Sequence, residues 1–335
     1  MYKTIKQNWD TVAKPLDSLG VFEELHSRIG AINKREHGII DKCAILVFCA
    51  DNGVVAEGIS QSGQEVTALC ADSISSGRSC LGTMTRRADT DIITIDVGIN
   101  SDETWDKVRN LKVAKGTKNF AQEPAMTKEQ VMKAIALGKD MVKECKDNDY
   151  SLIGIGEMGI GNTTTSSAVA AALLRLDATK VTGRGAGLSD EGLIRKINVI
   201  DTAISTYGLY DLTPIEVLRH VGGFDIAAMV GVCLGAKEYS MPIVLDGFIS
   251  MVAALLAVRI DKDTKNYLIP SHCSKEPAAR LIADELGLTP VIDARMALGE
   301  GTGAALMISL LRTIDSVYET SASFEGIKVE QYERH

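Results

Sequence analysis

The sequence predicts an α/β fold with a doubly wound, mostly parallel sheet. Short, continuous apolar runs, which are typical of strands buried on both faces, alternate with segments of helical periodicity. Most of these runs end in a polar or glycine-rich turn, as strands do at the open edge of a parallel sheet. No Pro/Ser-rich linker interrupts the 335 residues, so we expect one main domain with this alternating order.

The expected elements begin with helices over residues 1–40. Asp17 is the expected cap of a helix over residues 18–29, whose apolar side chains recur at helical spacing. Thr127 is expected to cap a helix that continues to Lys146. The expected strands cover residues 44–50, 91–97, 152–155, 242–246 and 267–270.

These elements divide the chain into three expected parts. Residues 1–40, together with part of the C-terminal helix, form a small helical cap. Residues 41–322 form the α/β catalytic domain of a Rossmann-like fold, and residues 323–335 form a polar tail.

Composition excludes several classes of protein. The net charge of -8 argues against general nucleic-acid binding. The seven cysteines are scattered without a C-x-x-C pair, and the five histidines are isolated, so we expect neither a disulfide framework nor a metal site. No apolar run is long enough to span a bilayer, so we expect a cytoplasmic protein without a membrane partner.

A glycine-rich loop after the strand at 152–155 is the feature around which the chain is organised. The following Ala/Leu-rich helix has Asn162 or the next threonine as its expected N-cap, and a helix N-terminus offers unpaired N–H groups to a phosphate. Glu157 lies inside this loop, where it either takes part in chemistry or only braces the backbone. Four glycines allow the backbone to approach a ligand closely: Gly154, Gly156, Gly159 and Gly161.

Two familiar phosphate motifs can be compared with this loop. It is not a Walker P-loop, because no Gly-Lys-Ser/Thr follows. Residues 154–159 formally match G-x-G-x-x-G, and Asp177 lies at a suitable distance beyond. An NAD-dependent oxidoreductase is therefore an alternative, although the additional glycine and threonine residues weaken the match.

Further polar residues accompany the other turns. Arg184 in a second glycine turn, Lys196 and Ser274 suit a phosphate and a sugar, although Lys196 could also be a solvated surface charge. Glu300, like Glu157, lies in a glycine-rich segment; it stands between two glycines, in a sequence that forms helix poorly. With no Gly-x-Ser-x-Gly elbow and no metal-ligand spacing, the pattern indicates a phosphorylated small molecule handled by a carboxylate.

Taken together, the motifs resemble those of the nicotinate-nucleotide:dimethylbenzimidazole phosphoribosyltransferases, the CobT family. They follow one another in the family's order over nearly the whole chain, so the set is far more specific than any one of them. The matching segments are residues 56–60, 64–67, 116–120 with 123–127, 156–164, 183–187 with 190–192 and Lys196, 222–226, 246–248, 271–274 with 276–277, and 298–303.

The resemblance implies a reaction and its site. Nicotinate mononucleotide would give its 5-phosphoribosyl group to an aromatic base with inversion at C1′, as a dimer and without a cofactor. The implied catalytic residues are Glu300 as the base and Glu157 as a second carboxylate. The implied acceptor residues are Asn52, Ser60 and Gln64. The implied phosphate and ribose residues are Gly159, Ile160, Gly161, Asn162, Thr163, Gly185, Gly187, Lys196 and Ser274.

Departures from the family pattern lie on the acceptor side and leave alternatives open. They are Asn52 where histidine is usual, Ser62-Gly63 in the following loop, and Cys273 where arginine is frequent. Because the family includes members that act on phenolic acceptors as one of two paralogous subunits, phenol or p-cresol is an alternative acceptor. A heterodimer is then an alternative to a homodimer. A catalytically idle paralogue that supports an active partner is a further alternative.

Overall fold

A six-stranded sheet forms the centre of the protein. The computed structural model describes residues 1–334, and neighbouring strands in the order β3-β2-β1-β4-β5-β6 all pair in parallel. This confirms the predicted doubly wound α/β class. The strands are β1 (Cys43–Ala50), β2 (Asp91–Gly98), β3 (Val108–Asn110), β4 (Leu152–Met158), β5 (Ile243–Leu245) and β6 (Leu268–Pro270).

Alternation along β1 divides the apolar core into two layers. Leu46 and Phe48 point to one face of the sheet, and Ile45 and Val47 point to the other, because successive strand side chains alternate. The first face is covered by α5 (Lys128–Asp147), α6 (Asn162–Leu174), α7 (Ala178–Val181), α8 (Asp190–Tyr207), α9 (Pro214–Val221), α10 (Phe224–Glu238), α11 (Phe248–Ile260) and α12 (Ala278–Leu286).

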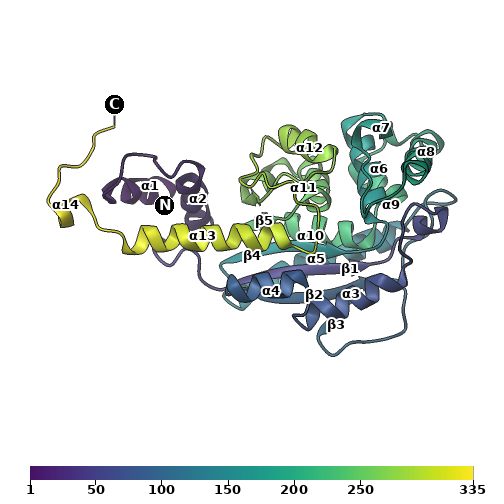
Figure 1. Cartoon of the computed structure of the whole chain (residues 1–335), viewed down its shortest axis with the longest axis horizontal. Coiled ribbons are helices and arrows are strands. Elements are labelled where there is room, and N and C mark those ends of the chain that lie inside the picture. The colour runs from purple at the N-terminus through teal and green to yellow at the C-terminus, as the bar shows by residue number, and fades with distance from the viewer. Residues whose placement is uncertain (335) are drawn as a thin grey trace.

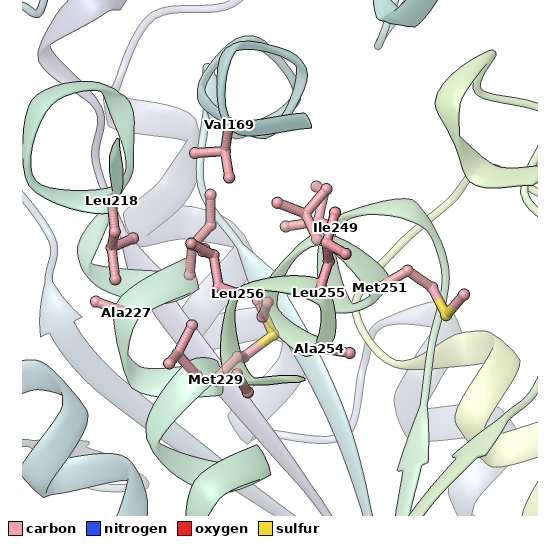
Figure 2. Close-up of a cluster of buried hydrophobic side chains, with 14 of the residues drawn as sticks. Val169, Leu218, Ala227, Met229, Ile249, Met251, Ala254, Leu255 and Leu256 are labelled. Atoms are coloured by element: carbon pink, nitrogen blue, oxygen red, sulfur yellow. The ribbon is translucent and has the colours of Figure 1, made fainter. Parts of the chain in front are cut away.

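The apolar layer on the first face of the sheet buries whole helices. Figure 2 shows Val169 of α6, Leu218 of α9 and Leu256 of α11 gathered in one cluster with other apolar side chains. The helices α6, α10 and α11 are buried along most of their length, and α10 and α11 are apolar on nearly every side, as is typical of helices in such an interior. The N-terminus of α6 is thereby fixed against the sheet edge.

The second face carries the helices from both ends of the chain. It is covered by α1 (Tyr2–Thr11), α2 (Val21–Asn33), α3 (Glu65–Ser75), α4 (Cys80–Arg87) and α13 (Thr302–Thr320). Figure 1 shows α13 running along the sheet to meet α1 and α2, with both chain termini at that end. The remaining short helical turns are η1 (Gly53–Glu57), η2 (Leu209–Asp211), η3 (Lys262–Tyr267) and α14 (Phe324–Ile327).

Buried polar contacts tie the terminal helices together. Trp9 Nε1 donates to His26 Nδ1 at 3.3 Å, and the opposite ring nitrogen of His26 lies 2.8 Å from Asp315 of α13. Within the predicted polar tail, Phe324 of α14 is buried, while residue 335 lies outside the described part of the chain. The domain boundaries after residues 40 and 322 stay a prediction.

A residue predicted to cap a helix does so only when its side chain is not taken up by another partner. Thr127 accepts from Gln130 N–H and caps α5 in a reciprocal capping box, which confirms that prediction. The prediction for Asp17 was wrong, because α2 begins after Gly20 and the Asp17 carboxylate accepts from Lys6 and Arg334 instead. The short strand β3 was not predicted, since three residues carry too little periodicity to be recognised.

No helix within residues 1–334 has both the length and the apolar character needed to cross a membrane.

Candidate active site

A cavity opens at the carboxyl ends of β4, β5 and β6. The strand order reverses between β1 and β4, and open parallel sheets bind ligands at such a reversal. The cavity and the solvent space at its mouth together span about 1050 Å³. Its walls include the loop after β4, the turn at residues 184–188, the segments after β5 and β6, and the loop before α13.

The loop after β4, for which the sequence predicts an anion site, has a different helix cap from the predicted one. Gly161, at φ 91°, is the N-cap of α6, and Asn162 is the first helical residue. The predicted cap role of Asn162 was wrong because its Nδ2 donates to the Glu157 carboxyl and, at 3.0 Å, to Asp225. The N–H groups of Gly161 and Thr163 donate to no group within residues 1–334, so they remain available to a phosphate.

Lys196 reaches this loop from the neighbouring helix α8. Its side chain is fully buried, and its Nζ donates to Thr163 Oγ1 at 2.9 Å and to the Gly183 carbonyl at 3.2 Å. Burial lowers the pKa of Lys196 to about 8, and the nearby carboxylate of Glu276 opposes that shift. Lys196 is therefore not a solvated surface charge, and its cation lies against the same turn as the free N–H groups.

The other predicted phosphate and ribose residues lie near this turn. Ser274, Gly185 and the backbone of residues 159–163 line the cavity. Gly185 has a φ of 54°, and a side chain there would meet Thr163 Oγ1 at 2.8 Å, so the turn can approach α6 only with glycine. Gly187 does not line the cavity; its carbonyl accepts from Gln61, which does.

Glu157 lies at the end of β4, beside Phe48 of β1, and lines the cavity floor. Burial, together with the nearby carboxylate of Asp225, raises its pKa to about 8. Asn162 bridges the two carboxyl groups through its single NH₂ group. A carboxyl group with such a pKa is largely protonated at pH 7.

Glu300 enters the cavity from the loop before α13. The loop has positive φ at three consecutive residues, Gly299, Glu300 and Gly301, which is a strained conformation for a glutamate. Burial raises the pKa of Glu300, whereas contacts with Leu81 N–H and Ser79 lower it. Its buried Oε2 has no hydrogen-bond partner within residues 1–334, so it is available to a ligand.

Two contacts hold the Glu300 loop in this conformation. Asp246, at the end of β5, accepts from Gly301 N–H at 3.1 Å and from Gly303 N–H at 2.7 Å. On the other side, Gly156 of β4 packs directly on the loop, since a side chain there would lie 2.5 Å from the Glu300 backbone. The two catalytic candidates, Glu157 and Glu300, are thus brought together by backbone contact between β4 and this loop.

We predict that Asp246→Asn weakens both stability and turnover. An asparagine has one acceptor oxygen in place of two, so one buried N–H loses its partner, at a cost of about 1–3 kcal/mol. Because the loop carries Glu300, kcat is expected to fall roughly 10- to 100-fold. Urea unfolding and steady-state assays would measure both effects, with exposed Asp149→Asn as the matched control. Unchanged values for the Asp246 variant would contradict the role given to this carboxylate.

The predicted acceptor residues are only partly brought to the cavity. Ser60 lines it, whereas Asn52 and Gln64 do not. Asn52 donates to the Ile160 carbonyl at 3.3 Å, and Gln64 donates to the Asn52 carbonyl at 3.0 Å, so Asn52 contacts the loop after β4 and Gln64 supports Asn52. The other positions of departure, Ser62-Gly63 and Cys273, also lie outside the cavity lining.

Three acidic residues near the cavity were not predicted as site residues. Asp225 follows a Gly-Gly pair at the start of α10, Asp246 directly follows β5, and Glu276 follows Ser274 by two residues. Of these three residues, only Asp246 has a sequence feature that could have identified it as a site residue, because it directly follows a buried strand. Asp225 and Glu276 come near the cavity through packing that no local pattern shows.

Comparisons with known proteins agree with this site. A sequence profile of a family described as Phosphoribosyltransferase matches residues 1–329. The chain is 41% identical over 329 residues to a nicotinate-nucleotide–dimethylbenzimidazole phosphoribosyltransferase of Acetivibrio thermocellus, covering 98% of this chain and 94% of that protein. It is also 41% identical over 328 residues to a protein of the same name from Clostridium acetobutylicum, covering 98% and 93%.

The fold is shared as well. The crystal structure of CobT from Thermus thermophilus matches with a TM-score of 0.92 at 35% identity and covers 99% of both chains. Both curated relatives are named for dimethylbenzimidazole, and the comparisons give no support to a phenolic acceptor. Because profile, sequence and structure agree over nearly the whole chain, we conclude that it belongs to the CobT family of phosphoribosyltransferases.

Proposed function

We propose that this chain transfers the 5-phosphoribosyl group of nicotinate mononucleotide to 5,6-dimethylbenzimidazole. The products are nicotinate and the α-riboside 5′-phosphate, for assembly of the nucleotide loop of a cobamide. One observation carries the proposal: a single cavity combines unpaired N–H groups at the α6 N-terminus, next to Lys196, with the buried carboxyl group of Glu157 and the partly buried one of Glu300. Relatives at about 41% identity that are named for this reaction support it.

Glu157 and Glu300 are assigned different roles because their surroundings differ. Glu157 is the more deeply buried and shares Asn162 with Asp225, so it is the group that retains its proton at neutral pH. Glu300 is then the ionised base that removes the proton of the acceptor as its nitrogen attacks C1′. The pyridinium of the donor leaves as a neutral ring nitrogen, so the leaving group requires no acid.

The donor phosphate is assigned to the loop after β4. The free N–H groups of Gly161 and Thr163, the positive end of the α6 dipole and the Lys196 cation all favour a dianion at this position. Ser274 adds a hydroxyl group to the same wall. The acceptor, dimethylbenzimidazole, then lies towards Ser60 and Glu300.

The purified chain alone, supplied with nicotinate mononucleotide and dimethylbenzimidazole, provides the direct test. We expect nicotinate release and one phosphoribosylated product, detected by chromatography and mass spectrometry. Parallel reactions with adenine, phenol and p-cresol measure acceptor choice. If nicotinate is not released above the rate without protein, the chain is not an independent enzyme and the proposal fails.

We infer that the active unit is a homodimer, following the resemblance to the family. Light scattering of the purified chain would give its mass in solution, and activity without a paralogue would exclude a heterodimer requirement. A monomer with full activity would contradict this assignment. The cytoplasmic location stays a prediction.

Donor binding is expected to depend on pH through Lys196. Its pKa of about 8 in the ligand-free protein means that the cation is lost as the pH rises through that value. The dissociation constant of nicotinate mononucleotide should therefore increase above pH 8, by up to about tenfold per pH unit. Calorimetry between about pH 7 and 9.5 measures it, and Lys196→Met should bind weakly at every pH in this window. A pH-independent affinity in the wild type would contradict the assignment of the phosphate to Lys196.

A further inference from the structure

We propose that Glu276 is the receptor for the ribose hydroxyl groups of the donor, and that it selects a ribonucleotide over a deoxyribonucleotide. This inference rests on the proposed function, since it assumes a nucleotide donor in the cavity. It goes beyond that function by assigning a second polar subsite and a specificity that neither the phosphate site nor the two catalytic carboxyl groups provide.

The first observation is a buried carboxylate with unused hydrogen-bonding capacity. Glu276 is 9% exposed, lines the cavity, and its Oε2 has no hydrogen-bond partner within residues 1–334. Leaving a buried acceptor without a donor costs free energy, so native proteins rarely do so without a reason. A ligand that brings hydroxyl groups into the cavity would supply the missing donors.

The second observation is that Lys196 does not use this carboxylate. Its Nζ donates to Thr163 and to the Gly183 carbonyl, and it forms no hydrogen bond with Glu276 in the described part of the chain. Glu276 acts on the lysine only through space, by raising its pKa. The carboxylate instead lies against Gly183, where any side chain would clash with its Oε2.

The third observation is the position of Glu276 relative to the phosphate site. Its backbone N–H donates to Ser274 Oγ at 3.4 Å, so both side chains come from one short segment after β6. A carboxylate repels a phosphate but accepts hydrogen bonds from neutral hydroxyl groups, and acidic side chains recognise ribose in this way in other nucleotide-binding folds. The 2′- and 3′-hydroxyl groups belong to the same sugar as the 5′-phosphate, so they lie within reach of adjacent subsites.

The test compares Glu276→Gln with the wild type by calorimetry, using nicotinate mononucleotide and its 2′-deoxy and 3′-deoxy analogues as donors. Binding is compared instead of turnover, because loss of the 2′-hydroxyl group also makes the glycosidic bond easier to break. The wild type should bind nicotinate mononucleotide roughly 10- to 100-fold more tightly than at least one deoxy donor. In Glu276→Gln that preference should shrink to within about threefold, because only the ribo donor loses a charged acceptor.

Two further variants separate this role from an effect on the phosphate. Ser274→Ala should weaken all three donors by a similar factor, because all three carry the phosphate. Glu276→Asp keeps a negative charge near Lys196 but withdraws the oxygens by one methylene group, so it should also lose the preference for the ribo donor. Circular dichroism would show whether Glu276→Gln folds. If it does not, the donor preference of Glu276→Asp tests the proposal instead.

The proposal is overturned if the wild type binds all three donors alike. It is also overturned if Glu276→Gln weakens all donors equally, which would mean that the residue acts only through Lys196, or if the preference persists in the Gln and Asp variants. Failure of the proposed function is distinguishable, because the wild type would then neither bind nicotinate mononucleotide nor release nicotinate.

Discussion

Replacing Glu300 with glutamine is expected to lower kcat by roughly 10²- to 10⁴-fold while donor affinity changes little. The side chain keeps its size, and the strained loop keeps its contacts with Asp246 and Gly156, so only the ability to accept a proton is lost. Burial raises the pKa of Glu300 above its usual range and so makes the ionised carboxylate a stronger base.

Single-turnover kinetics and calorimetry on the same preparation would separate the chemical step from binding. Glu325→Gln is the matched control, because it makes the same change on an exposed side chain of α14. Near-normal turnover of Glu300→Gln would remove Glu300 from the role of base. Glu157 would then be the next candidate, and its raised pKa would predict a turnover that increases as the pH approaches about 8.

Replacing Lys196 with methionine should weaken nicotinate mononucleotide binding by about 10- to 150-fold. The change removes a charge-assisted hydrogen bond to the phosphate, worth roughly 1.5–3 kcal/mol. The free energy of unfolding should change much less, because burial of the lysine already lowers its pKa and an apolar side chain of similar length avoids that cost. The combination of a weakened affinity and a retained stability is the distinguishing result.

Calorimetry and urea unfolding would measure the two quantities, with Lys180→Met at an exposed site as the control. An unchanged donor affinity would mean that the phosphate binds elsewhere. A large loss of stability with normal affinity per folded molecule would mean that Lys196 is a structural link between α6 and α8.

Patterns in the sequence predict the fold class and the chain segments that carry the cavity. Apolar runs at 44–50, 91–97 and 152–155 became β1, β2 and β4, because strands buried on both faces must be continuously apolar. The capping box at Thr127 fixed the start of α5, because its contacts span only three residues. The ordered motifs also identified the family, which the comparisons confirm.

The contacts of individual polar side chains, in contrast, depend on the folded chain. Asn162 has the sequence of a helix cap, but Asp225, which is 63 residues away, occupies its amide group. Lys196 could not be distinguished from a surface lysine until α8 was seen packed on α6. The roles assigned to Glu157 and Glu300 stay predictions. The surroundings of the two side chains also depend on residues that are distant in sequence, such as Asp225 near Glu157 and Gly156 beside the Glu300 loop.

The residues implied for the acceptor also have contacts that the sequence did not predict. The family resemblance implied Asn52 and Gln64 as acceptor residues. In the folded chain neither lines the cavity: Asn52 donates to the Ile160 carbonyl, and Gln64 donates to the Asn52 carbonyl. Asp246 reaches Gly301 and Gly303 across more than 50 residues, and Glu276 meets Gly183 only because the segment after β6 and the turn before α8 lie at one cavity. Local patterns determine which residues are helical or extended. The direction and protonation of a buried polar side chain depend on partners that are distant in sequence and that only the folded chain brings together.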